Sequence, residues 1–253
     1  MPRERFLKAV FPLLLVLVLV SVFNVKSVKA ATQVNILTHS GWLDSIGYYH
    51  VSGEVENVGD VATSFVKITA TFYDQSDTVV ATSFAYAELS ILLPERKSPF
   101  EVLLTDTTQA AKVHHYSLSI TFSITDPIPL GLEILSNSSY IDEVGYMHVV
   151  GEIKNIATGR ATYVKVIATF YNLTGHVIAT AFTYSDPSDL DPGQKAPFEI
   201  LLLHTDRVPL VASYALTAES SQYALVPELN TLGLTFLFIM LTLAITIKHL
   251  SQK

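Results

Sequence analysis

Apolar and polar residues alternate along much of the chain, most clearly in the stretch VKITATFYD from Val66 to Asp74. Every second position there is valine, isoleucine, alanine or phenylalanine, and lysine, threonine and tyrosine stand between them. Side chains of a β-strand point alternately to its two faces, so this pattern predicts a strand with one buried face. The alternation recurs in residues 49–55, 100–104 and 116–122. Breakers such as NVGD, DQSD and LLPERKSP separate these runs and predict turns between short strands.

The nine-residue phrase returns as VKVIATFYN, from Val164 to Asn172. An offset of 98 residues aligns residues 34–120 with 132–218 without a gap. About 35 of roughly 87 aligned positions are identical, which indicates two duplicated structural units. Asp74 and Asn172 end the two phrases, and because their short polar side chains bond nearby backbone groups, a turn is predicted after each strand.

Each copy shows six or seven short strands over about 90 residues, without a helical pattern between them. This spacing is typical of a Greek-key, immunoglobulin-like sandwich. We therefore predict an all-β fold with two tandem immunoglobulin-like antiparallel β-sandwich domains, over residues 31–123 and 132–218. The proline-containing segment 124–131 is predicted to be a short, stiff linker, and residues 219–228 a stalk.

Three motifs of each copy resemble the FxLYD domain family: G-x-V/I-x-N, a strand ending in A-T-F-Y-D/N, and P-x-x-x-x-P-F-E. The residues that carry the match are Gly53, Asn57, Phe72, Tyr73, Asp74, Pro94 and Phe100 in the first copy and Gly151, Asn155, Phe170, Tyr171, Pro192, Gly193 and Phe198 in the second. The chain departs from the family pattern by having phenylalanine before the tyrosine, and Glu95 in place of a glycine. The resemblance implies small β-sandwich modules of exported bacterial and archaeal proteins, without a general biochemical activity.

The N-terminus combines three basic residues within the first eight positions with an apolar run of roughly 16 residues. This arrangement predicts a secretory signal peptide over residues 1–30, with cleavage after Ala30. A retained N-terminal anchor is the alternative, because Lys26 and Lys29 lie unusually between the apolar run and the cleavage site.

Residues 229–247 form an uncharged run of about 19 residues, long enough to cross a hydrocarbon core as a helix. The tail 248–253 contains two lysines, and basic residues favour the cytoplasmic side. We therefore predict a single-pass transmembrane helix in the cell membrane, with the bulk of the chain extracytoplasmic. A buried core helix is disfavoured because no polar stripe interrupts the run. The preceding VPE also resembles surface-protein sorting signals read by exosortase- or archaeosortase-type enzymes, with a plain anchor as the alternative.

Acidic residues dominate the part between the two apolar ends. Residues 31–228 contain nine lysines and arginines against 22 aspartates and glutamates, so their net charge is near −13. This charge repels phosphate backbones and disfavours nucleic-acid binding. Cysteine is absent from the sequence, which excludes disulfides, thiol catalysis and cysteine-type zinc sites.

Histidine and aspartate recur together in the two copies, as His50 with Asp44 and His148 with Asp142. Such a pair binds a metal or transfers protons in many proteins. The alternation places His50 on the solvent-facing side of its strand, and two ligands fall short of the four that zinc takes. We therefore expect exposed structural residues and assign no metal, cofactor or catalytic residue.

Lysine and glutamate also recur on the predicted outer faces, as Lys67 and Glu101 and again as Lys165 and Glu199. Cross-strand ion pairs on a wet sheet face are the expectation for them. The sequence contains no G-x-S-x-G, phosphate-loop or H-E-x-x-H motif. We therefore do not expect an enzyme.

A few further positions are candidates for recognition or modification. His114 and His115 point to opposite faces of a strand and cannot chelate one ion together. Trp42, the single tryptophan, is expected to plug the core from its edge, with a contact residue at one end of a sandwich as the alternative. The sequons NSS at Asn137 and NLT at Asn172 are candidate N-glycosylation sites in an exported chain.

Together these features favour a non-enzymatic, membrane-anchored protein that displays two β-sandwiches outside the cell to an envelope or surface protein partner. Its membrane partner is the lipid bilayer, its oligomeric state is open, and no cofactor is expected. The alternatives are a ligand- or metal-binding extracellular sensor and an accessory subunit of a membrane complex.

Overall fold

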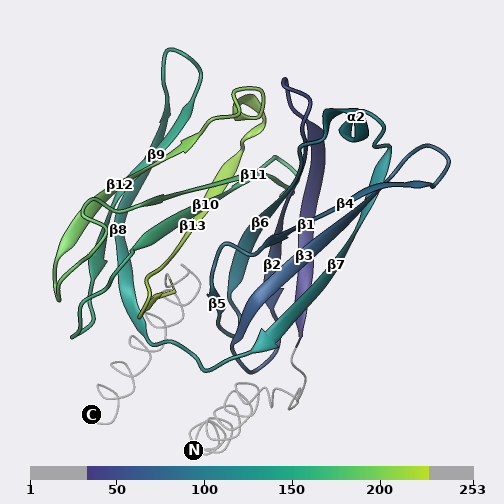
Figure 1. The fold of residues 1–253 in the computed structure, drawn as a ribbon. Coiled ribbons are helices and arrows are strands. Elements are labelled where there is room, and N and C mark those ends of the chain that lie inside the picture. The colour runs from purple at the N-terminus through teal and green to yellow at the C-terminus, as the bar shows by residue number, and fades with distance from the viewer. Residues whose placement is uncertain (1–32, 228–253) are drawn as a thin grey trace, which may run out of the picture.

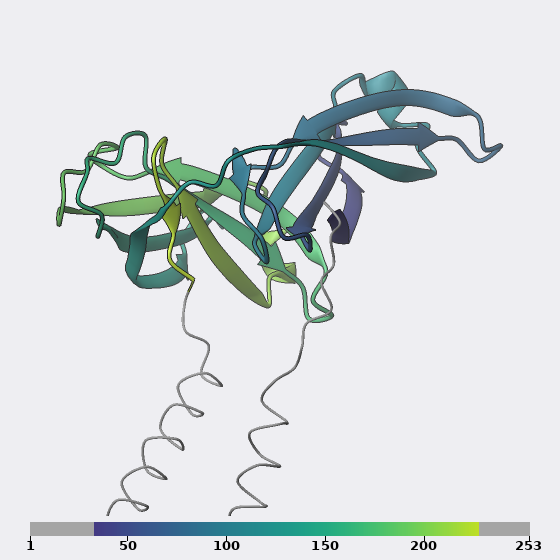
Figure 2. The same cartoon turned by 90° about the horizontal axis from the view of Figure 1, so that it is seen from below.

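The computed structural model describes residues 33–227, and this part of the protein is all-β. The two repeats lie side by side, and their sheets form four successive layers (Figures 1 and 2). Within residues 33–227 no helix is long and apolar enough to cross a membrane. The predicted signal peptide, its cleavage site, the predicted span 229–247 and the tail lie outside the described residues.

Within the described chain, the first repeat contains the strands β1 (Val34–Leu43), β2 (Tyr49–Asn57), β3 (Thr63–Tyr73), β4 (Val79–Tyr86), β5 (Ile91–Leu92), β6 (Lys97–Leu104) and β7 (His115–Ile124). Strands β1, β2 and β6 pair antiparallel and form one sheet, here called sheet A1. Strand β3 pairs with β4, β7 and the short β5 and forms the opposing sheet, B1. A four-residue helix, α2 (Thr107–Ala110), connects the two sheets after β6.

The second repeat contains β8 (Leu130–Ile141), β9 (Met147–Asn155), β10 (Lys165–Tyr171), β11 (Val177–Tyr184), β12 (Lys195–Leu202), β13 (Ser213–Glu219) and β14 (Ala224–Leu225), with one turn of 3₁₀ helix, η1 (Val208–Leu210). Strands β8, β9 and β12 form sheet A2, and β11, β10 and β13 form sheet B2. The short β14 pairs with both β13 and β8, so the two sheets join along one side.

Each repeat has its own hydrophobic core between its two sheets. Phe72 and Phe100 are fully buried in the first core, and Phe170 and Phe198 occupy the equivalent positions in the second. Burial alternates along β3, as the sequence predicts: the apolar positions face the core, and the lysine, threonine and tyrosine positions are half-buried. The turns predicted after Asp74 and Asn172 are present, because each side-chain oxygen accepts backbone N–H bonds two and four residues later.

A buried asparagine organises the loop after the second strand of each repeat. The Asn57 amide donates to the carbonyl oxygens of Val61 and Leu92, and its side-chain oxygen accepts from the Gly59 N–H. Asn155 makes the equivalent bonds with Gly159, Leu190 and Ala157. Both asparagines are fully buried, so the N of the G-x-V/I-x-N motif serves to satisfy backbone groups away from water.

The stalk predicted over residues 219–228 is partly wrong. Glu219 ends β13, and Ala224 and Leu225 are buried in β14, which pairs with Leu130 and Leu132 of β8. The apolar residues of this segment complete the second sandwich, because burying them in its core is favourable. The predicted linker 124–131 is also shorter, since β7 reaches Ile124 and β8 begins at Leu130.

We predict that Asn57→Ala lowers the free energy of unfolding by about 2–4 kcal/mol, because it removes the amide donor to the Val61 and Leu92 carbonyls inside the fold, while the Gly59 N–H keeps its bond to the Gln33 carbonyl. Asn155→Ala should cost a similar amount. Urea unfolding of the purified protein, followed by circular dichroism, measures both values. The control is Asn35→Ala, which removes an exposed bond from Gln33 and should change stability by less than about 0.5 kcal/mol. Equal losses in all three variants would contradict this role.

Candidate functional site

The two repeats meet through the outer face of sheet A1 and the outer face of sheet B2, so the layers follow in the order B1, A1, B2, A2 (Figure 1). Strand β11 of the second repeat contacts β1, β2 and β6 of the first. We call this contact the joint. It contains several of the residues that the sequence singles out, among them Trp42, His50, Glu101 and Lys165.

An apolar centre closes the joint. Ile167 and Val177 are fully buried, although both lie on the outer side of sheet B2, and Ile167 packs with the core residues of the first repeat. The equivalent positions of sheet B1 are not covered: Val79 is 54% exposed, and Thr69 is half-buried. Sheet A1 therefore covers the outer face of B2 around Ile167 and Val177, whereas Phe182 and Tyr184 on the same face are 49% and 48% exposed.

Two charged residues of the joint hold groups of the opposite repeat. The Tyr171 hydroxyl donates to Glu54 Oε1 over 2.8 Å. Lys165 Nζ donates to the backbone oxygen of Glu88 over 2.6 Å and lies 3.1 Å from its carboxylate. Burial raises the pKa of Glu54, although Tyr171 and Lys97 act against this change. Hydrogen bonds to a charged partner in a dry contact are stronger than neutral ones, so these pairs set the register of the two sheets.

A second group of polar contacts surrounds Glu219 and Arg96. Glu219 accepts bonds from the N–H and hydroxyl of Ser90, at 2.8 and 2.9 Å. The Arg96 guanidinium donates to the Leu225 carbonyl over 2.8 Å and to the Thr217 hydroxyl over 3.2 Å. Burial raises the pKa of Glu219 and lowers that of Arg96. Each of these bonds crosses between the repeats, so the joint fixes their relative orientation.

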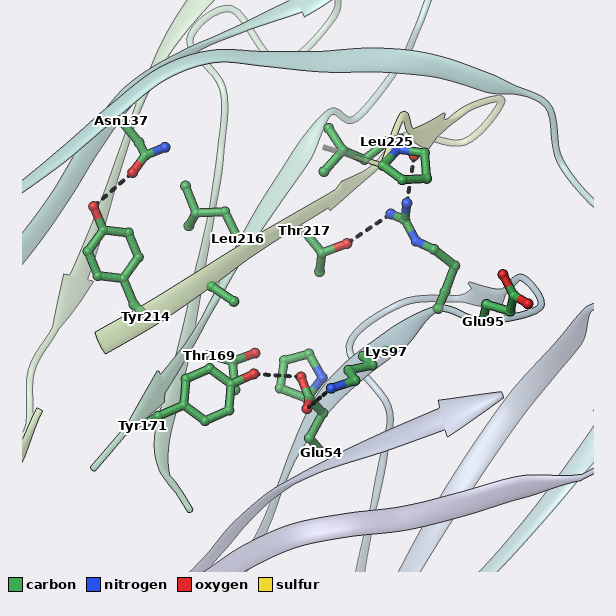
Figure 3. A pocket seen from close by; sticks show the side chains of 14 residues that line it. Glu54, Glu95, Lys97, Asn137, Thr169, Tyr171, Tyr214, Leu216, Thr217 and Leu225 are labelled. Atoms are coloured by element: carbon green, nitrogen blue, oxygen red, sulfur yellow. Dashed lines mark hydrogen bonds and ion pairs between the residues drawn. The ribbon is translucent and has the colours of Figure 1, made fainter. Parts of the chain in front are cut away.

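A cleft of about 470 Å³ opens at the rim of the joint (Figure 3). Tyr171 and Glu54 lie on one side of the view, and Asn137 and Tyr214 on the other. The polar groups that line it are largely bonded to one another: Tyr171 to Glu54, and the Tyr214 hydroxyl to Asn137 Oδ1 over 2.8 Å. The geometry therefore favours a structural seam over a ligand pocket.

His50 lies in the joint, between two carboxylates. Its Nδ1 is 2.9 Å from Glu101 Oε1, and its Nε2 is 3.1 Å from Asp44 Oδ2. Burial alone lowers the pKa of His50, but the bonds to Glu101 and Asp44 outweigh burial and raise it. The expectation that His50 faces solvent is wrong: it is only 5% exposed, because the second repeat covers the outer face of its strand.

Trp42 stacks on the imidazole of His50 with ring centroids 4.2 Å apart. From the second repeat, His204 contacts the indole edge-on at 4.7 Å, and the Arg207 guanidinium lies 4.7 Å from the ring centroid. Burial and the nearby His50 lower the pKa of His204. Trp42 thus lies at the joint between the repeats, so the contact-residue alternative describes its position better than a plug of its own core.

His50, Glu101 and His204 also form a candidate metal site, since one ligand atom of each lies within 4.8 Å of the others. Such nitrogen and oxygen ligands suit zinc. However, both ring nitrogens of His50 already face carboxylates, and an imidazole that donates from both nitrogens has no lone pair for a metal. A metal ion would have to displace one of these bonds. The expectation that the chain binds no metal stays a prediction.

The second repeat builds the same network without a covering domain. His148 Nδ1 is 2.7 Å from Glu199 Oε1, its Nε2 is 3.1 Å from Asp142 Oδ2, and Tyr140 stacks on it at 4.5 Å. Hydrogen bonds to Glu199 and Asp142 raise the pKa of His148. No counterpart of His204 contacts this network among the described residues, and yet the network forms. The aspartate–histidine–glutamate arrangement therefore does not depend on a covering domain and belongs to the fold of each repeat.

The lysine–glutamate ion pairs expected on the outer faces are wrong. The glutamates bond the histidines instead, Lys165 reaches Glu88 of the other repeat, and Lys67 lies over the Phe84 ring at 3.9 Å. The strand positions explain this difference: the histidine and the glutamate are diagonal neighbours on adjacent strands of sheet A, whereas the lysines lie on sheet B.

The remaining candidates lie at separate places. His115 stacks on Tyr73, and the two adjacent histidines, His114 and His115, are oriented edge to face. Asn137 is exposed on β8, and Asn172 lies in the turn before β11, where its side-chain oxygen is bonded locally. Their glycosylation stays a prediction. The joint itself was missed by sequence reasoning, although Ile167 in place of Thr69 was a visible signal.

We predict that His50→Gln destabilises the protein in a pH-dependent manner. A raised folded pKa means that the stabilisation is fully present below the unfolded value of about 6.5 and is lost as the pH rises through the folded value. The loss should be about 1.5–3 kcal/mol at pH 6.5 and should shrink toward pH 9. Urea unfolding at each pH measures it, and starting at pH 6.5 keeps His204 mainly neutral.

The matched control is His148→Gln, which removes the same network from an uncovered face and should cost less at every pH. A loss for His50→Gln that grows from pH 6.5 to pH 9 would show that His50 is not held as the charged form.

No protein-family model matches this sequence, and no curated protein matches it. Solved structures with some similarity include the exo-chitosanase CsxA of Amycolatopsis orientalis, at 12% identity over 74% of this chain and 26% of that chain, with a TM-score of 0.28. Red sea bream transglutaminase has 8% identity over 77% of this chain and 30% of that chain, with a TM-score of 0.25. The chain thus spans less than a third of the length of these structures. Scores this low carry no argument about its function.

Proposed function

We propose that this protein is a non-enzymatic, membrane-anchored extracytoplasmic protein that presents two immunoglobulin-like β-sandwiches as one rigid body to a surface or envelope protein. The observation that carries the proposal is the joint: Ile167 and a set of cross-repeat polar contacts unite the sandwiches, and the rim cleft is lined by groups bonded to each other. A rigid body with broad free sheet faces suits recognition of another protein.

The joint distinguishes this arrangement from two beads on a flexible string. Contacts between domains of one chain are usually polar and permit relative motion unless they are large and apolar. Here a fully buried isoleucine lies at the centre, and charged hydrogen bonds surround it. The two repeats therefore hold one orientation, which lets residues of both contribute to a single binding surface.

The two ends of the described chain support the proposed membrane attachment. Val34 pairs with Asn57, the Asn57 N–H donates to the Arg96 carbonyl, and the Arg96 guanidinium donates to the Leu225 carbonyl. The first and last strands thus start and end on one side of the body, toward the bottom of Figure 1. A signal or anchor before residue 31 and a span at residues 229–247 would both connect to that side.

The structural roles of the shared motifs support the proposed relation to FxLYD modules. Asn57 and Asn155 satisfy buried backbone groups, and Phe72 and Phe170 fill the cores. Residues with these roles are expected in modules that vary in partner and keep a common fold. The absence of cysteine from the sequence agrees with stabilisation by burial and hydrogen bonds alone.

A metal-binding sensor is the second candidate, and the trio of His50, Glu101 and His204 is the observation that favours it. Calorimetric titration of the purified protein with zinc separates the two candidates. We expect no one-to-one binding heat at micromolar zinc, because His50 is engaged by two carboxylates. A stoichiometric heat that disappears in His204→Ala would favour the sensor instead.

Membrane topology is testable with high contrast because the chain contains no cysteine. Ser76→Cys places a thiol in the exposed turn between β3 and β4, where only the backbone N–H of Ser76 is bonded. We expect a membrane-impermeant maleimide to label this variant on intact cells. Lys253→Cys, beyond the proposed span, should be labelled only after the cells are permeabilised. Labelling of Ser76→Cys that also needs permeabilisation would overturn the proposed topology.

A further inference from the structure

The four-layer order leaves two outer faces uncovered, and each is the repeat-equivalent of a face that is buried in the joint. The outer face of sheet B1, here called free face B, includes Lys67, Thr69 and Tyr73 and corresponds to the B2 face of the joint. The outer face of sheet A2, here called free face A, includes Tyr140 and Glu152 and corresponds to the A1 face. The molecule therefore carries both halves of its own internal contact on opposite sides.

The charged anchor of the joint has a counterpart on these faces. Lys165 bonds Glu88 inside the joint, and the equivalent residues are Lys67 on free face B and Asp186 beside free face A. Lys67 lies over the Phe84 ring, much as Lys165 lies over Phe182. The backbone supports the match, since Asp186 N–H donates to Pro197 as Glu88 N–H donates to Pro99. Opposite charges thus stand at equivalent places on the two free faces.

The tyrosine–glutamate bond also has a counterpart. Tyr171 donates to Glu54 in the joint, and Tyr73 and Glu152 are the equivalent residues. Glu152 pairs with Lys195 at 3.3 Å, in the position that Lys97 takes beside Glu54. On free face B the Tyr73 hydroxyl bonds Ser117 over 3.3 Å and its ring stacks on His115, so a glutamate from another copy would replace or share the bond to Ser117.

Exposed aromatic side chains accompany these anchors. Phe84 and Tyr86 are 55% and 51% exposed on free face B, about as much as their equivalents Phe182 and Tyr184 (49% and 48%) at the edge of the joint, and Tyr140, the equivalent of Trp42, is 50% exposed on free face A. Aromatic residues are enriched at protein interfaces because they combine a large apolar area with a polar group. Both free faces therefore have the composition of a contact surface.

Three differences make the free faces weaker partners than the faces of the joint. Thr69 stands where Ile167 closes the joint, Gln194 stands where Arg96 donates to the other repeat, and Thr121 stands where Glu219 accepts from Ser90. The apolar centre, one charged donor and one charged acceptor are thus missing. A contact between these faces should be reversible, whereas the joint within one chain is permanent.

The geometry permits such a contact on a membrane. The layers stack sideways in Figure 1, whereas the first and last described strands start and end at the bottom. A second copy could stack on either side and repeat the relation between the two repeats. Its chain ends would then lie on the same side of the row as those of the first copy. Anchored chains would also meet at a high local concentration, which strengthens weak contacts.

We propose that a second copy of this chain docks its free face A on free face B of the first, repeating the relation between the two repeats. The contact is head-to-tail, so each added copy leaves one face of each kind open, and rows of copies form rather than closed twofold dimers. This inference rests on the proposed surface function and deepens it, because it names the partner as another copy of the chain.

Charge reversal at the predicted ion pair tests the proposal. The full chain in detergent is examined by sedimentation velocity over a range of concentrations, and carbodiimide, which joins amines to adjacent carboxylates, traps the species on a gel. We expect a ladder beyond the dimer. Lys67→Asp and Asp186→Lys should each weaken association by at least tenfold, and a mixture of the two variants should restore it, because opposite charges then meet at every contact.

A matched pair of variants at the centre gives an independent measurement. Thr69→Ile restores the apolar group that closes the joint and should tighten association about tenfold. Thr69→Ser should leave it unchanged within about twofold. Circular dichroism verifies that each variant is folded.

Three outcomes would overturn the proposal: a monomer at all concentrations, association that is indifferent to Lys67 and Asp186, or a ladder that stops at the dimer. Association through the predicted transmembrane span would persist in the charge variants, and this persistence would distinguish it from association through the free faces. The cysteine-labelling experiment reads topology alone, so failure of self-association and failure of the proposed surface location are told apart.

Discussion

The burial of one sheet face determines the architecture of this protein. Sheet B2 turns its outer face toward sheet A1, and Ile167, fully buried there, joins the core of the first repeat. Without that contact, Lys165, Tyr171 and Glu219 would be ordinary surface residues of a sandwich, and His50 would face water. With it, two small domains that each have a limited core act as one body.

Polar groups give the joint its specificity. Glu54 and Glu219 are buried and Lys165 is largely so, which costs desolvation energy that their hydrogen bonds offset. Removing one partner would leave a buried charge unpaired, so a shifted register of the two sheets is disfavoured more strongly than an apolar contact alone would achieve. Ile167 contributes attraction, and the charged pairs select one orientation. The same division explains why the free faces, which keep the lysine and tyrosine of the joint and lack its isoleucine, suit a reversible contact.

Alternation and self-similarity were sufficient to predict the all-β fold, because both depend on the strand period and the buried face within each repeat. They place His50 and Ile167 on outer faces correctly, yet they carry no information on what covers an outer face. The position of His50 was therefore predicted wrongly from a correct strand, and the joint was missed. Similarly, Ala224 and Leu225 follow a turn and show no alternation, so their role in the second sandwich depends on a distant strand. The FxLYD resemblance and the membrane segments remain predictions from sequence.

The sequence differences between the two repeats depend on which sheet faces are covered in the four-layer order. Core positions such as Phe72 and Phe170 are identical, because both sandwiches require the same side-chain packing between their sheets. Outer positions differ where only one copy is covered: Thr69 against Ile167 on sheet B, and Ser52, fully buried, against Val150, half-buried, on sheet A. The substitutions thus separate a permanent contact from an open one, while Lys67, Tyr73 and Glu152 keep the charged and hydroxyl groups of the joint. A purely solvent-facing surface has no physical need for that complementary set, which argues that the free faces meet a partner built like the joint.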